Sequence, residues 1–219
     1  MAQRLAQQRR PALAGAHRVA HIFATRYDAV DRDLPALLAR ERPDIVLLFG
    51  VATRTRHLRI EERARNRVSL FPDAGGHRPA ARTIVPHAPA RRNPLPFARL
   101  AMAARSTGLA ALRSRNAGTY LCNYAYWRAL EAAHSPGGPR LVLFVHVPPI
   151  GGKAQPRRKR SAGRAGHARP RLDELVRAGE AIMLAMMSLA RGKGIPSHLG
   201  PYSFPGSVKS CADSGQESD

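Results

Sequence analysis

The chain of 219 residues is long enough for one medium-sized domain, and 44% of its residues are hydrophobic, which is near the norm for globular proteins. It contains no apolar run of the roughly 20 residues that a membrane-spanning helix needs, and its N-terminus lacks the apolar core of a secretory signal. Its two cysteines, Cys122 and Cys211, give no disulfide framework, so we expect a cytoplasmic protein with free thiols.

The formal net charge of +21 would suit a nucleic-acid-binding protein. Nearly all of the cations are arginines, however, and they are scattered through a background rich in Ala, Pro and Gly, with one dense cluster at Arg157–Arg160. The sequence has no RNA-binding, zinc-binding or helix-turn-helix signature, and aromatic residues make up only 5%. We therefore favour a biased composition with an exposed basic loop, and keep a basic nucleic-acid-associated protein as an alternative.

The first half of the chain indicates an α/β protein. A helix is predicted over Asp31–Glu41, followed by a short turn and the continuous apolar run Ile45–Gly50, which is typical of a strand buried on both faces. A helix, a short turn and a buried strand in succession favour a mostly parallel sheet. Leu58–Val68 is expected to be extended, and short strands are expected at Ala20–Thr25 and Arg82–Pro86.

The second half continues this pattern up to a polar tail. We predict helices at Phe97–Thr107, Cys122–Ala133 and Pro170–Arg191, with a weak strand at Leu109–Ser114 and a strongly apolar strand at Leu141–Val147. Residues 151–170 are basic and rich in Gly and Pro, so we expect an exposed, mobile loop. The chain is thus predicted to form one α/β domain over residues 1–192 and a disordered or irregular tail over 193–219.

Cys122 and His146 are the candidate chemical groups. Cys122 follows a turn at Gly118 and opens a predicted helix, where unpaired N–H groups and the helix dipole favour the thiolate. His146 closes an apolar strand just before Pro148. A thiol at a helix start and an imidazole at a strand end are the parts of a nucleophile–base pair. An isolated cysteine is more commonly a buried structural residue, so these positions alone leave both interpretations open.

Several motifs resemble those of one family. Ala117–Asn123 resembles the nucleophile motif of the pyroglutamyl-peptidase I (pyrrolidone-carboxylate peptidase) family, and Phe144–Pro148 resembles its histidine motif at the same spacing. Glu61, with its offsets to Ala64 and Asn66, resembles the family's glutamate motif. The resemblance covers roughly residues 10 to 190.

The resemblance implies a three-layer α/β/α sandwich and a cytoplasmic cysteine peptidase that removes N-terminal pyroglutamate from peptides through a thioester acyl-enzyme. Cys122 would be the nucleophile, His146 the general base and acid, and Glu61 the group that orients the imidazole. The Cys122 backbone N–H would contribute to an oxyanion hole. No metal or cofactor and no membrane association are implied, and family members are often homotetramers.

Two features depart from the family pattern. The family opens with a strand and a Gly-Phe-x-Pro-Phe-Gly loop that helps to build the pyroglutamyl pocket, and this chain has no counterpart, so it resembles an N-terminally truncated member. A missing strand would leave an unpaired sheet edge. The family's arginine ahead of the Pro-Asp turn is replaced by Leu70 and Phe71. A catalytically impaired homologue that lacks the substrate pocket is therefore a second hypothesis.

Overall fold

A computed structural model of the chain describes residues 1–151 and 169–192. The basic cluster Arg157–Arg160, most of the predicted loop, the predicted tail and Cys211 lie outside the described residues. The helices and strands are, in chain order, α1 (Ala2–Ala6), the short 3₁₀ helix η1 (Pro11–Leu13), α2 (Tyr27–Glu41), β1 (Ile45–Val51), β2 (Leu58–Glu61), β3 (Arg63–Ala64), β4 (Arg91–Arg92), α3 (Phe97–Arg105), β5 (Ala111–Ser114), α4 (Leu121–Ala133), β6 (Leu141–Val147) and α5 (Leu172–Arg191).

The main sheet has four strands in the order β1-β6-β2-β5. β1 pairs with β6 and β2 pairs with β5 in parallel, whereas β2 and β6 are antiparallel. Two of the three pairings are parallel, which confirms the predicted mostly parallel sheet. β3 and β4 form a separate two-stranded antiparallel sheet.

Three predictions about strands need correction. Ile45–Gly50 does form a strand, but β1 lies at the sheet edge and its residues are half-buried or exposed, because only β6 pairs with it. Arg82–Pro86 forms no strand, since the backbone N–H groups of Ile84 and Val85 donate hydrogen bonds to Asn66 Oδ1 and not to a neighbouring strand. Ala20–Thr25 also forms no strand, because none of the described strands pairs with it.

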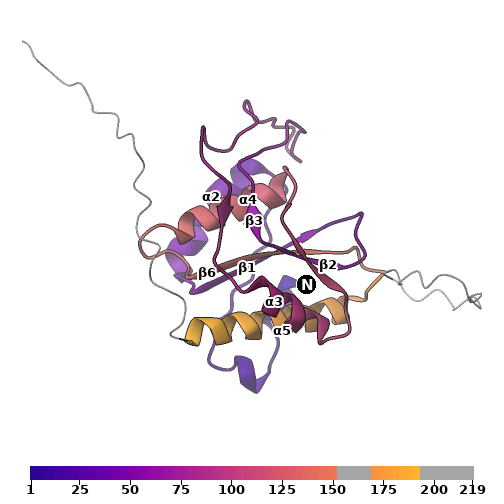
Figure 1. The fold of residues 1–219 in the computed structure, drawn as a ribbon. Coiled ribbons are helices and arrows are strands. Elements are labelled where there is room, and N and C mark those ends of the chain that lie inside the picture. The colour runs from indigo at the N-terminus through magenta and orange to yellow at the C-terminus, as the bar shows by residue number, and fades with distance from the viewer. Residues whose placement is uncertain (152–168, 193–219) are drawn as a thin grey trace, which may run out of the picture.

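Helices cover both faces of the sheet (Figure 1). One core cluster joins α2 and α4 to one face, and the other joins α3 and α5 to the opposite face. This is the three-layer α/β/α arrangement that the resemblance implied. Among the described helices, none is both long and apolar enough to cross a membrane.

Alternation along β6 decides which side of the sheet each side chain faces. Val142 and Phe144 belong to the core cluster under α4, whereas Leu143 and Val145 belong to the cluster under α3 and α5. By the same alternation, His146 faces α4. The two core clusters thus fix the layer in which the candidate site must lie.

Candidate active site

Glu61 lies on the same face of the sheet as His146. Leu58 and Ile60 of β2 pack in the cluster under α3 and α5, so Arg59 and Glu61 point the other way, toward α4. In the antiparallel register of β2 and β6, Arg59 stands opposite His146. The two strands bring together side chains that are 85 positions apart in the sequence.

Glu61 and His146 form a buried carboxylate–imidazole pair. The His146 Nδ1 atom lies 2.8 Å from Glu61 Oε1, and the residues are 6% and 0% exposed. A carboxylate that accepts a hydrogen bond from Nδ1–H fixes the imidazole tautomer in which Nε2 is unprotonated. In that tautomer Nε2 is able to take up a proton.

Arg59 is a second partner of Glu61 that the sequence motifs did not reveal. Its Nη2 atom lies 3.0 Å from Glu61 Oε1, donates to Ser114 Oγ at 2.8 Å and also donates to the backbone carbonyl of Asn116. One guanidinium therefore joins the carboxylate to β5 and to the loop that leads to α4. Alternation along β2, which puts residues 59 and 61 on one face, was the signal that could have identified it.

Cys122 sits in the first turn of α4, next to β1. Tyr120 is the N-cap and no side chain caps the helix, so the N–H groups of the first turn keep no side-chain acceptor. A Cβ atom built on Gly50 would lie 2.7 Å from Cys122 Sγ. Gly50 is the direct register partner of His146, so the thiol lies over β1 beside the imidazole. Within the part of the chain that is described, no hydrogen bond joins Cys122 to His146.

The surroundings of Cys122 favour its protonated thiol over the thiolate. Burial raises the pKa of Cys122, the negative charge of Glu61 raises it further, and a backbone N–H at the helix start lowers it. The helix N-terminus acts in the predicted direction, but burial outweighs it. The arrangement therefore suits a thiol that loses its proton to a base during attack.

Two side chains of α4 fix the helix against β2, which carries Glu61, and against the segment that follows β3. Asn123 is fully buried and donates to the carbonyls of Arg65 and Arg67, while its Oδ1 accepts the Arg65 N–H at 2.8 Å. The Tyr126 hydroxyl donates to the Glu61 carbonyl at 3.0 Å. These contacts set the position of Cys122 relative to β2.

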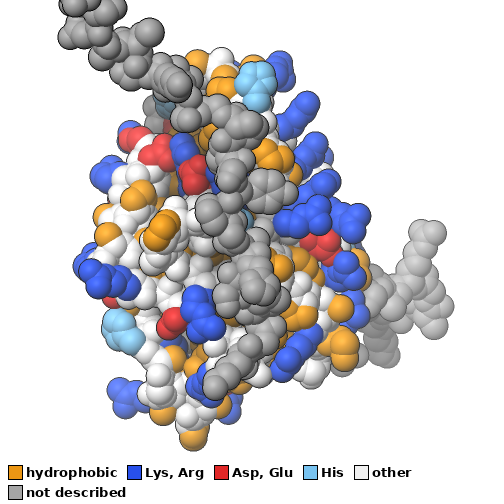
Figure 2. Space-filling view, turned by 60° about the vertical axis from the view of Figure 1, so that its left-hand side comes forward, with side chains coloured by type: hydrophobic (Ala, Val, Ile, Leu, Met, Phe, Trp, Pro, Cys, Tyr) orange, Lys and Arg blue, Asp and Glu red, His pale blue; other side chains and the backbone are white. Residues whose placement is uncertain are grey.

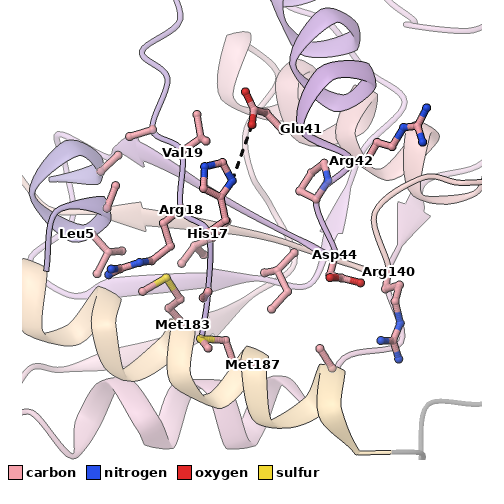
Figure 3. Close-up of a pocket in the computed structure, with 18 of the residues that line it drawn as sticks. Leu5, His17, Arg18, Val19, Glu41, Arg42, Asp44, Arg140, Met183 and Met187 are labelled. Atoms are coloured by element: carbon pink, nitrogen blue, oxygen red, sulfur yellow. Dashed lines mark ion pairs between the residues drawn. The ribbon is translucent and has the colours of Figure 1, made fainter. Parts of the chain in front are cut away.

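Three cavities lie elsewhere. One of about 520 Å³ lies beside β1 on the face opposite the thiol, with Met183 and Met187 of α5 on one side and the His17–Glu41 ion pair on the other (Figure 3). The second, of about 420 Å³, is lined by α2 and by residues near Ile84, and the third follows β1. Cys122, His146 and Glu61 line none of these three. Within residues 1–151 and 169–192, no three His, Cys, Asp or Glu side chains are grouped so that they could hold a metal ion.

The fold and this site define a class: an α/β protein whose half-buried thiol lies beside a carboxylate-bound imidazole. The chain belongs to the pyroglutamyl peptidase family, whose model matches residues 2–168. A pyrrolidone-carboxylate peptidase from Thermococcus kodakarensis is 34% identical over 124 residues, which are 56% of this chain and 60% of that protein. One from Thermococcus litoralis is 33% identical over 53% of this chain and 54% of that protein.

Solved structures of the family share the fold. The pyrrolidone carboxyl peptidase from Thermococcus litoralis superimposes with a TM-score of 0.63 at 26% identity, over 75% of this chain and 76% of that chain. A mutant from Pyrococcus furiosus gives a TM-score of 0.69 over 86% of this chain and 89% of that chain, and its 24% identity speaks for the fold alone. In the sequence comparisons of the preceding paragraph, by contrast, this chain spans only 60% and 54% of the lengths of the two Thermococcus relatives.

Proposed function

We propose that the chain is a cysteine peptidase that cleaves the peptide bond after an N-terminal pyroglutamyl residue. The observation that carries the proposal is the buried Glu61–His146 pair on the sheet face over which the Cys122 thiol lies. Membership of the pyroglutamyl peptidase family supplies the substrate class.

Each of the three side chains has one task in the proposed reaction. His146 Nε2 takes the Cys122 proton as the sulfur attacks the pyroglutamyl acyl carbonyl, and Glu61 stabilises the imidazolium that forms. The imidazolium then gives its proton to the leaving amine, the C–N bond breaks and a thioester remains. His146 next activates a water molecule that hydrolyses the thioester. The uncapped first turn of α4, with the Cys122 N–H, faces the developing oxyanion.

The test is hydrolysis of a pyroglutamyl fluorogenic amide by the full chain. We expect turnover by the wild type and by Cys211→Ala, and turnover at background level for Cys122→Ala. A folded wild type that releases no fluorophore would contradict the proposal, as would a Cys122→Ala protein that keeps its activity. Circular dichroism of each protein shows whether it is folded.

A catalytically impaired homologue is the second candidate, and two structural features favour it. None of the three cavities described above is lined by the site residues. Phe71, which stands where the family pattern has an arginine, is 74% exposed. In that case Cys122, in a Cys211→Ser background, would react with iodoacetamide while the fluorogenic amide stays intact. Measuring both reactions on one preparation separates the two candidates.

A further inference from the structure

A polar cavity of about 400 Å³ lies beyond the C-terminal end of β1. Three guanidinium groups and two hydroxyls dominate its lining, which consists of Thr53, Arg54, Thr55, Arg56 and Arg169. The first four belong to the connection between β1 and β2. Because β1 and β6 run parallel, this connection lies at the same end of the sheet as His146, the last residue but one of β6.

Both sides of this arginine-lined cavity are anchored to the sheet. Thr55 donates its backbone N–H and its hydroxyl to the Ala52 carbonyl, each at 3.1 Å, and the Ala52 N–H donates to the Val147 carbonyl at 2.9 Å. On the other side, the Gly151 N–H donates to the carbonyl of Pro170, next to the third arginine, at 3.1 Å. The backbone that carries the three guanidinium groups is thus fixed to the ends of β1 and β6.

The positive charge of the cavity is not neutralised by nearby acids. Arg54, Arg56 and Arg169 are exposed, and within the described ranges none of them forms an ion pair. The adjoining residues 152–168 contain no Asp or Glu. The excess of positive charge is not confined to the cavity, since the face of the protein in Figure 2 shows more Lys and Arg than acidic side chains. The planar fork of a guanidinium matches a carboxylate in shape and charge.

The cavity is within reach of a peptide bound at the thiol. Arg54 is four positions after Gly50, which the thiol overlies, so their Cα atoms are at most about 14 Å apart. Two residues of an extended peptide span about 7 Å, and an arginine side chain bridges much of the remainder. We infer that the arginine-lined cavity binds a carboxylate in the leaving part of the substrate, either a free C-terminus or an acidic side chain. This inference rests on the proposed function.

Two matched peptide pairs test the inference and distinguish the sources of the carboxylate. Pyroglutamyl-alanine and its amide differ only in the C-terminal charge, and the amides of pyroglutamyl-glutamate and pyroglutamyl-glutamine differ only in the side-chain charge. For the wild type we expect kcat/KM to be about fivefold higher for the anionic member of at least one pair, as suits exposed ion pairs. The triple variant Arg54→Gln/Arg56→Gln/Arg169→Gln should treat both members alike and hydrolyse the neutral fluorogenic amide normally.

A control variant separates the cavity from the general charge of the protein. Arg4, Arg9 and Arg191 are also exposed and line no part of this cavity, so their replacement by Gln removes the same charge elsewhere and should leave the preference intact. Equal kcat/KM within both pairs, or an equal loss of preference in both triple variants, would overturn the inference. A wild type that does not cleave the neutral amide would instead reject the proposed function. In that case, calorimetric titration of the same peptides into Cys122→Ala protein tests the arginines without catalysis. Tighter binding of the anionic member of a pair would support the inference, and equal binding of both members would overturn it.

Discussion

Arg59 reaches the same oxygen of Glu61 that holds His146. Its Nη2 atom lies 3.0 Å from Glu61 Oε1, the atom that is 2.8 Å from His146 Nδ1, whereas Glu61 Oε2 is buried without a hydrogen-bond partner. The carboxylate is therefore held through one oxygen, by one strand neighbour and one cross-strand neighbour. Removal of either partner would leave the carboxylate of Glu61 held by a single side-chain contact.

The first prediction follows from this contact. Arg59→Gln should lower kcat for a pyroglutamyl amide about tenfold with little change in KM, because Arg59 positions Glu61 from outside the substrate site. Arg59→Lys should recover part of the loss, since an ammonium keeps one donor near the carboxylate. Arg113→Gln, which removes a surface ion pair with Glu62, is the control. Equal kcat for wild type and Arg59→Gln would show that Arg59 has no positioning role.

Gly50 leaves space for the thiol, and this predicts the effect of adding one methyl group. In Gly50→Ala, the new Cβ would lie 2.7 Å from Cys122 Sγ and 2.8 Å from Phe144 Cζ, so at least one of them must move. We expect a loss of about 1–3 kcal/mol in the free energy of unfolding, from overpacking, together with reduced turnover. Urea unfolding and the fluorogenic assay measure the two effects. Gly15→Ala, where a Cβ meets no atom within 4 Å, should change neither.

The raised pKa of Cys122 predicts how the thiol reacts with pH. Burial and the Glu61 charge both disfavour the thiolate, so the rate of iodoacetamide alkylation should be low at neutral pH and rise at a pH above that of an ordinary cysteine. Glu61→Gln removes one of these causes and should move the rise to lower pH. The experiment uses a Cys211→Ser background, so that only Cys122 reacts. A rise below the ordinary value would mean that a thiolate is already present in the resting protein.

Asn123 is predicted to be the main polar anchor of the helix start. Asn123→Ala would remove three hydrogen bonds to the backbone of Arg65 and Arg67 and leave buried polar groups unpaired, at a cost of about 3 kcal/mol. Chemical denaturation gives this value directly. Asn116→Ala, at an exposed position in the preceding loop, should cost less than about 1 kcal/mol. A similar loss in both variants would contradict the anchoring role.

Much of the fold could be predicted from local patterns. The helices at residues 97–105, 121–133 and 172–191 and the strand at 141–147 were expected within a few residues, because apolar periodicity and turn residues act over short stretches of chain. Cys122, His146 and Glu61 were identified by their motifs. The structure brings these three side chains to one face of the sheet, and their catalytic roles remain a proposal.

The sequence by itself determined the longer helices and the two long apolar strands, and which residue types are present for the chemistry. The tertiary structure alone decided that β6 is central and β1 is at the edge, since both read as apolar runs and only pairing distinguishes them. It also decided that Arg59 shares Glu61 with His146 and that Gly50 lies beneath the Cys122 thiol. These relationships join residues far apart in the chain, and strand register and layer packing, which no local pattern encodes, create them.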